Sequence, residues 1–550
     1  MKSGSEVIEV NLEELEALRE RARQGPLGEE DCQRLEAAIH ALSYLIERIG
    51  EKNTTISQLR ALLAKPSTEK TSKVLEQAGI KAPPPSSSPP KQNENKKPGH
   101  GRNGTKAYRG ARRIKIAHAS LKPGGRCPEC LKGKVYEQKE PALRIRVVGQ
   151  APIAATVYEL ERLRCNLCGE VYEAEAPQEV GEKKYDESAA AMIALLKYGS
   201  GVPFYRLEGL EASLGIPLPA STQWEIVEEI AAVIRPAFDE LIREAAQAEV
   251  FYNDDTSMKI LALARASPQR AEEQEASDSK ERTGLFTSGI VSMRQGQRIA
   301  LFFTGRQHAG ENFAQVLAHR AKGLAPPIQM CDALSRNLPK LPEKLEILLG
   351  NCNAHARRRF VQVTPNFPQE CQFVLESLRE VYRYDGEAEA LDLSPEARLR
   401  FHQEHSAPVM DALHAWFKAQ FAEKKVEPNS GLGEAISYCL KRWDRLTLFL
   451  HQAGAPLDSN IVERALKKCI LHRKNSLFYK TTNGAEVGDL FMSLIHTCEL
   501  NSANPFDYLT ELQRHAEELA ENPAAWMPWN YRQGLHQAGT SKDPLKPRLE

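Results

Sequence analysis

The sequence predicts a multidomain protein of the α+β class. It has 550 residues, which is more than one domain usually contains. Apolar residues recur at helical spacing near the N-terminus, whereas short apolar runs between residues 248 and 332 end in aspartate, as buried strands do. A stretch of only Pro and Ser at residues 83–90 separates the two patterns, and such a composition cannot bury a core.

Composition limits the classes of function. Lys plus Arg (73) equals Asp plus Glu (73), so the net charge identifies no partner. The sequence contains no run of about 18 apolar residues, and residues 1–6 lack an apolar signal core. Eleven cysteines without a signal fit a reducing compartment. We therefore expect a cytoplasmic protein that makes no use of a membrane.

Residues 1–80 predict a helix that self-associates. Apolar residues recur there at intervals of seven, at Leu35, Leu42, Ile49, Ile56 and Leu63. This spacing favours a coiled coil and hence a homo-oligomer; the alternative is an amphipathic helix packed on its own domain. Residues 81–118 follow as a basic linker rich in Pro and Gly, which either tracks a phosphate backbone or only keeps the chain soluble.

Residues 119–180 contain two CxxC pairs, Cys127 with Cys130 and Cys165 with Cys168. Two residues between thiols let both sulfurs bind one tetrahedral ion, and two such pairs complete a closed site of four thiolates. We expect a zinc ribbon, with free thiols as the alternative. Four protein ligands leave no open position, so this Zn²⁺ would be structural.

Residues 181–247 predict helices interrupted by a turn at Leu214–Pro217, with Ser221 or Thr222 as the N-cap of the second helix. Helix, Gly-containing turn and helix are the parts of a helix-turn-helix reader of DNA. Plain helical packing is the commoner explanation of such a pair, and both interpretations stay open.

Three separated carboxylates are the candidates for catalysis. Asp254 and Asp332 each follow an apolar, strand-like run, and Glu463 stands in the first turns of a predicted helix. Carboxylates at strand ends meet at one edge of a sheet, where such a set would hold two divalent metals for phosphoryl transfer. Asp255 competes with Asp254, because neighbours on a strand face opposite sides, and Asp458 competes with Glu463.

The order of these acids matches an RNase H-like core, which needs an Asp on its first strand, an Asp after a later strand and an acid on a helix. We expect this core in two parts, residues 248–342 and 451–512. The mainly helical residues 343–450 form an insertion between them, and residues 513–550 form a C-terminal tail.

Basic residues accompany the predicted catalytic helix. No acid occurs in residues 464–480, so Glu463 precedes a run of cations, which suggests a metal ligand beside a polyanion. A solvated acid that favours the helix dipole is the alternative. The candidate DNA contacts are Arg357, Arg358, Arg464, Lys467, Arg473 and Lys474. Cys352 and His355 are two metal-binding residue types, but a histidine satisfied by hydrogen bonds is the more usual case.

Taken together, these segments resemble the bacterial insertion sequence 66 family of DDE transposases over nearly the whole chain. Asp255 stands where the family has Glu, and Ala333 and Leu334 replace a common Gly-Tyr. The matching segments are, in family order, Gly99–Arg102, Asp254–Thr256, Thr304–Arg306, Cys331–Asn337, Cys352–Arg358, Leu457–Arg464 and Pro528–Trp529.

The resemblance implies cutting at an element's terminal inverted repeats and joining of the 3′ ends to target DNA. It assigns catalysis to Asp254, Asp332 and Glu463, with two Mg²⁺ per active site, which Mn²⁺ can replace. The implied partners are the DNA of the ends and target, further copies of the chain, and small accessory proteins of the same element. An inactive or repurposed DNA-binding protein is the main alternative, and a stand-alone RNase H-like nuclease is a third.

Overall fold

The structure is a computed structural model. It describes residues 70–80, 118–138, 151–164, 183–265, 284–342 and 345–535, with shorter runs within 21–35, 115–116 and 166–181. The predicted seam from Leu42 to Leu63 lies outside these residues, as does most of the basic linker. The chain divides into two compact units, Met1–Ala82 with Ala155–Glu550 and Pro83–Ala154. The larger unit combines many helices with a mixed sheet, so the predicted α+β class is confirmed.

The central sheet has the strand order β5-β4-β3-β6-β7. Its strands are β3 (Val250–Ser257), β4 (Phe286–Arg294), β5 (Gln297–Gly305), β6 (Ile328–Cys331) and β7 (Leu348–Asn351). Strands β3, β4 and β5 are antiparallel neighbours, whereas β6 and β7 run parallel to β3. The strands are mostly apolar and buried, as expected for a sheet covered by helices on both faces.

Two helices identify the two faces of this sheet. A Cβ on Gly289 of β4 would meet Leu466 and Val462 of α17 (Asn460–Ser476), so α17 packs closely on that face. The preceding residue, Ser288, accepts a hydrogen bond from Asn312 of α10 (Ala309–Leu317) at 2.8 Å. Because successive side chains on a strand point to opposite faces, α10 and α17 cover opposite sides of the sheet.

Helix α18 (Thr482–Leu500) protects the open edge of β5. Polar residues every four positions along α18 and its C-cap accept hydrogen bonds from alternate N–H groups of the strand. The pairs are Thr304 N with Asp489 (2.6 Å), Phe302 N with Ser493 (2.9 Å), Ala300 N with Thr497 (3.0 Å) and Arg298 N with Asn501 (3.1 Å). Four helix residues advance about 6 Å and two strand residues about 6.8 Å, so the two spacings nearly match. The edge is therefore closed to pairing with another chain.

The first prediction concerns Asp489. Burial raises the pKa of this carboxyl to about 7, although hydrogen bonds from Thr304 favour its charged form. Its contribution to stability is fully present below its ordinary pKa of 3.8 and is lost as the pH rises through about 7. Asp489→Asn keeps an acceptor for Thr304 N. We expect the melting temperature of this variant to change less between about pH 5 and pH 8 than that of the wild type.

Thermal melts at several pH values measure this difference, with the exposed carboxylate variant Asp507→Asn as the control. The control should follow the wild type across the range. Parallel curves for Asp489→Asn and the wild type would show that Asp489 does not titrate with folding.

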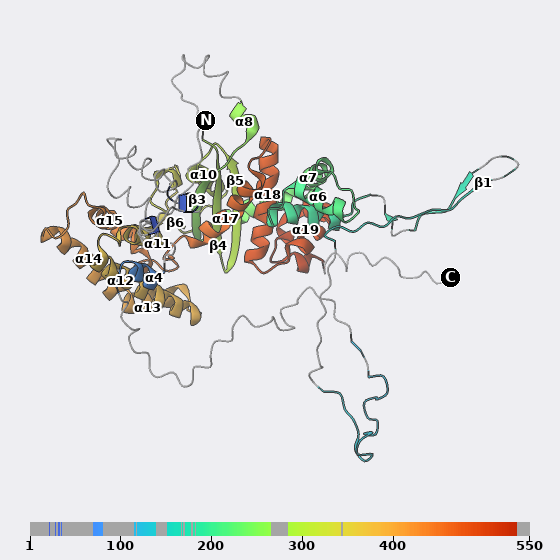
Figure 1. Ribbon diagram of the computed structural model, residues 1–550, viewed down its shortest axis with the longest axis horizontal. Helices are drawn as coiled ribbons and strands as arrows, with labels where there is room; N and C mark the ends of the chain where they lie inside the picture. The colour runs from blue at the N-terminus through green and yellow to red at the C-terminus, as the bar shows by residue number, and fades with distance from the viewer. Residues whose placement is uncertain are drawn as a thin grey trace. The chain divides into compact units, whose positions relative to one another are not determined.

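Helices precede and follow the strands of this sheet along the chain, and they pack around it (Figure 1). Before the sheet come α4 (Thr71–Gln77), α5 (Glu187–Ala194), the π-helix η3 (Leu195–Gly199), α6 (Phe204–Ser213) and α7 (Ala220–Ala246). Shorter elements beside the sheet are α8 (Leu261–Arg265) and the 3₁₀-helix η4 (Ser335–Asn337). Helices α11 (Asn353–Val363), α12 (Pro368–Ala390), α13 (Pro395–His405), α14 (Ala407–Ala422), α15 (Gly431–Leu440), α16 (Trp443–Leu446) and η5 (Leu448–Leu450) lie between β7 and α17. The chain continues after α18 with α19 (Pro505–Arg514), α20 (Ala516–Glu521) and η6 (Pro523–Trp526).

The structure adds two details to the sequence analysis, one at the start of α7 and one in the predicted C-terminal tail. Helix α7 begins at Ala220 after Pro219, so Ser221 and Thr222 lie inside its first turn and do not cap it. In the predicted tail, Trp526 and Tyr531 are buried, so the chain is packed as far as Tyr531. No helix in the described part of the chain combines the length and apolar character needed to cross a membrane.

Candidate active site

Asp254 lies near the carboxyl end of the central strand β3, opposite Gly289 of β4. Paired residues of antiparallel strands point to the same face, and the Gly289 position faces α17. Asp254 therefore belongs to the face of the sheet that carries α17. Its neighbour on the strand, Asp255, belongs to the opposite face.

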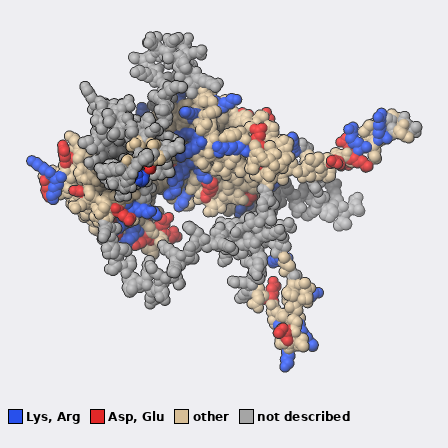
Figure 2. All heavy atoms as spheres, viewed as in Figure 1, with Lys and Arg blue, Asp and Glu red and all other residues tan. Residues whose placement is uncertain are grey.

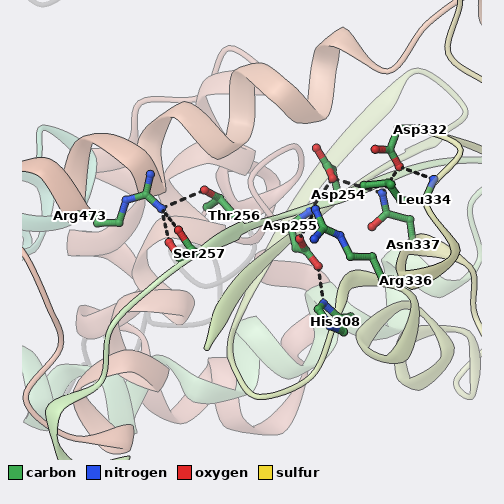
Figure 3. Close-up of polar contacts among 10 residues, drawn as sticks. All are labelled: Asp254, Asp255, Thr256, Ser257, His308, Asp332, Leu334, Arg336, Asn337 and Arg473. Atoms are coloured by element: carbon green, nitrogen blue, oxygen red, sulfur yellow. Dashed lines mark hydrogen bonds and ion pairs between the residues drawn. The ribbon is translucent and has the colours of Figure 1, made fainter. Parts of the chain in front are cut away.

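Asp332 follows β6, the parallel neighbour of β3, and lies close to Asp254. The side-chain amide of Asn337 donates to Asp254 Oδ1 at 3.2 Å and to Asp332 Oδ1 at 2.5 Å (Figure 3). Burial raises the pKa of Asp254 to about 6, and the nearby charge of Asp332 adds to this rise. The two carboxylates thus converge on a single donor, where positive charge is favoured.

Asn337 is held by a buried network of amides. Its backbone oxygen accepts from Asn253 Nδ2 at 2.7 Å and from Gln329 Nε2 at 2.8 Å, and Gln329 Nε2 also reaches Asn253 Oδ1 at 2.8 Å. All three residues are fully buried. Asn253 and Gln329 belong to none of the motifs in the sequence, and their only local signal is that both are polar residues inside apolar strand runs.

Asp255 has a structural environment on the other face of the sheet. Its side chain is 1% exposed and pairs with His308 Nδ1 at 2.8 Å and with Arg336 at 3.3 Å. His308 is also the N-cap of α10, where it forms a capping box with Glu311. Asp255 therefore ties α10 and η4 to the sheet, which leaves Asp254 as the carboxylate beside Asp332.

Glu463 lies in the first turn of α17. This helix packs on the same face of the sheet as Asp254. The carboxylate oxygens of Glu463 lie 3.6 Å from His355 Nε2 and 3.6 Å from Arg358, both on α11. Among the residues that the structure describes, no three His, Cys, Asp or Glu side chains are placed to hold a metal ion. The structure thus brings Asp254 and Asp332 together and pairs Glu463 with α11.

The segment around Cys352 fixes the start of α17. Cys352 Sγ accepts from Ser459 N at 3.3 Å, and Asn353 N donates to Leu457 O at 3.1 Å. Contact with the Cys352 side chain, and secondarily the charge of Glu463, raises the pKa of His355. Asp458 accepts from Asn460 N at 3.0 Å and from its amide at 2.7 Å, so it shapes the entry to the helix.

The six predicted DNA contacts have different environments. Arg464, Lys467 and Lys474 are exposed along one side of α17, and Lys and Arg gather in this middle part of the molecular face in Figure 2. The other three are engaged with the protein. Arg473 donates to Thr256 Oγ1 (3.2 Å) and to both Ser257 oxygens, Arg357 to Thr71 Oγ1 (3.0 Å), and Arg358 pairs with Glu463.

A comparison with known families finds a match over the middle of the chain. A model of the transposase IS66 family matches residues 183–487, which is more than half of the 550-residue chain. The chain belongs to the IS66 family of transposases. The resemblance predicted from the sequence is therefore confirmed, and both aspartates, Asn337 and the start of α17 lie within the matched transposase region.

This transposase family member is similar to three curated proteins of Sinorhizobium fredii (strain NBRC 101917 / NGR234). Uncharacterized protein y4qI is 28% identical over 63% of this chain and 62% of its own length. Uncharacterized protein y4jD is 27% identical over 75% of this chain and 79% of its own. Uncharacterized protein y4hP is 26% identical over 68% of this chain and 67% of its own length. The chain thus spans less than two thirds of the first relative.

Hydrogen bonds fix the backbone around the first CxxC pair, Cys127 and Cys130. In the smaller unit, Cys127 N donates to Gly133 O at 2.8 Å, and Gly133 N donates to Cys130 Sγ at 3.4 Å. The hydrogen bond from the Gly133 amide lowers the pKa of Cys130, and a lower pKa favours the thiolate form that binds metal. Cys165 lies outside the described residues; Cys168 lies in the larger unit between β1 (Arg162–Arg164) and β2 (Val171–Glu173).

Proposed function

We propose that this protein is a DNA transposase that binds the terminal inverted repeats of its element, cleaves there and joins the 3′ ends to target DNA. Asp254, Asp332 and Glu463 are its catalytic acids. The observation that carries the proposal is the convergence of Asp254 and Asp332 on Asn337, on the face of the sheet packed by the Glu463 helix.

The catalytic core is RNase H-like in this proposal. Three antiparallel strands followed by two parallel ones support that assignment, with one acid on the first strand, one directly after the fourth and one on a later helix. Residues 248–342 and 451–512 form the core, and the helices within 343–450 form its insertion. Asp254 and Asp332 meet because β3 and β6 are parallel neighbours, whose carboxyl ends lie at one edge.

The carboxylate oxygens fit Mg²⁺ or Mn²⁺, which are hard cations with oxygen ligands. The fit rests on the two aspartates, whose oxygens already surround one amide donor. When bound, the two metal ions of such a site activate the attacking oxygen and stabilise the leaving oxygen of a phosphodiester. Asp254, Asp332 and Glu463 would hold these ions, with Asp254 serving both ions and Asp332 and Glu463 serving one each.

The protein residues have separate tasks in this reaction. Asn337 fixes the orientation of both aspartates through the buried amide network. Exposed Arg464, Lys467 and Lys474 hold the DNA backbone along α17 without reading its sequence. Glu463 pairs with His355 and Arg358 in this structure, and it would have to leave these two contacts to hold a metal ion.

The remaining domains serve assembly and DNA binding. Residues 1–80 associate as a coiled coil, and the two CxxC pairs hold a structural Zn²⁺. Helices α6 and α7 are a candidate helix-turn-helix, although α7 also packs against α5 and α18. Small accessory proteins of the same element are candidate partners, and the protein acts in the bacterial cytoplasm at the nucleoid.

A catalytically inactive DNA-binding protein is the second candidate function. The observation that favours it is the pairing of Glu463 with His355 and Arg358 of α11. Purified protein incubated with a plasmid that carries the element's ends and Mg²⁺ separates the two functions. The transposase releases 3′-hydroxyl ends at the repeats and joins them to new DNA, whereas binding without any cut would establish the inactive protein.

The zinc assignment predicts about one zinc ion per chain by elemental analysis. Cys165→Ser should lower this content, because a three-thiolate site binds zinc less tightly and the ribbon loses its folding energy with the metal. Cys32→Ser, which changes an exposed cysteine outside the two pairs, should retain the wild-type content. Full zinc content in Cys165→Ser would refute the four-thiolate site.

A further inference from the structure

The turn that follows α17 has an unusual backbone. Leu477 has φ +67° and ψ −41°, and Phe478 N donates to Ser476 O at 2.8 Å, which closes a three-residue turn. This is close to the γ-turn with a positive central φ, which is rare and strained for a residue with a side chain. Glycine adopts such an angle without strain, yet the chain has leucine there.

The two apolar side chains of this turn point into solvent. Leu477 is 62% exposed and Phe478 is 40% exposed. Neither the strain nor the exposure is compensated by core packing, since neither side chain belongs to the buried core. Adjacent exposed apolar residues on a rigid support are typical of a contact with another molecule.

The residues on both sides of the turn are firmly anchored. Before it, Ser476 Oγ accepts from Lys197 Nζ at 2.9 Å, and Asn475 Nδ2 donates to Gly201 O at 3.1 Å. After it, the buried Tyr479 donates its N–H to Lys259 O at 2.8 Å and packs with Met258 and Ile260. The turn is therefore held in place before any ligand arrives, which lowers the entropic cost of binding.

Exposed cations lead along α17 to this turn. Arg464, Lys467 and Lys474 lie on the exposed side of the helix, and exposed Lys480 follows the turn. Charge of this sign fits a phosphate backbone. Glu463 and Leu477 are 14 residues apart, which is about 21 Å along a helix, or about six base-pair steps of duplex DNA.

We propose that Leu477 and Phe478 form an apolar wedge that contacts unstacked bases of the bound DNA, about six base pairs from the cleaved phosphate. The inference rests on the proposed transposase function and adds a base-contacting element to it. Apolar side chains inserted at a base step unstack it and deform the duplex, provided that they are held rigidly while cations grip the backbone. The anchors on both sides of the turn supply the rigidity, and α17 supplies the cations.

Fluorescence of 2-aminopurine tests the wedge, because this base brightens when it is unstacked. Duplexes of the terminal inverted repeat carry it singly at positions about four to eight base pairs from the cleavage point, a window centred on the helix-length estimate. The full-length wild type should raise the signal severalfold at one or two of these positions. Leu477→Gly, which also relieves the strained angle, and Phe478→Ala should each remove most of that rise.

Leu391→Gly is the matched control, because Leu391 is 63% exposed at the C-cap of α12 in the helical insertion. It should leave the signal unchanged. Equal brightening by the wild type and both wedge variants would overturn the proposal and leave the patch to a protein partner. Wild-type cleavage without brightening at any position would overturn the wedge alone, whereas brightening without cleavage would support the wedge and contradict the proposed function.

Discussion

Asp254→Ala and Asp332→Ala are each expected to slow cleavage of end-containing DNA by on the order of 10³-fold or more, since losing even an outer-shell partner of a metal ligand costs about 10–100-fold. Each substitution removes an anion that offsets the charge of divalent metal. DNA affinity should stay within about twofold, because phosphate contacts come from Arg and Lys. Single-turnover cleavage and a gel-shift titration measure the two quantities.

The neighbouring Asp255 provides the control for these variants. Asp255→Asn keeps the size of a side chain that is 1% exposed but weakens its pairs with His308 and Arg336. We expect a lower melting temperature and near-normal cleavage per folded molecule. An inactive, folded Asp255→Asn together with an active Asp254→Ala would place the catalytic register one residue away from our assignment.

Glu463→Gln is expected to abolish cleavage and joining as completely as the aspartate variants. The amide retains the shape of the side chain and its contacts with α11, but it lacks the negative charge that a divalent ion requires. If Glu463 served only to pair with His355 and Arg358, the amide would cost little activity. The same cleavage assay in Mg²⁺ and in Mn²⁺ distinguishes these roles.

Asp458→Asn is the matched control on the same helix entry. Asp458 accepts two hydrogen bonds from Asn460, and an amide oxygen can still accept the one from the backbone. We expect this variant to retain measurable joining. Retained joining by Glu463→Gln and its loss in Asp458→Asn would exchange the roles of the two acids.

The sequence alone was sufficient to find the strands that carry Asp254 and Asp332. Apolar runs that end in a carboxylate follow from burial and strand alternation, which are local properties. The first turn of α17 could also be predicted from the sequence, because Glu463 precedes a basic amphipathic run. Strand alternation alone leaves Asp254 and Asp255 as competitors, and in the structure Asp255 is the one buried in pairs with His308 and Arg336.

Other parts of the site depend on tertiary contacts and had no local signal. Asn337 joins the two aspartates only because η4 folds back onto β3 and β6. Arg473 was grouped with the DNA contacts, yet in the fold it donates to Ser257 and Thr256 at the end of β3. Sequence composition does not distinguish a cation that holds the protein together from one that faces DNA.

Anomalous diffraction from Mn²⁺ in crystals of the protein bound to its element-end DNA tests the central claim most directly. The account predicts Mn²⁺ at about 2.1 Å from oxygens of Asp254 and Asp332, with Glu463 released from His355 and Arg358 to become a ligand. Glu463 still paired with α11, and no anomalous signal beside the two aspartates, would contradict the assignment of these three acids as the catalytic set.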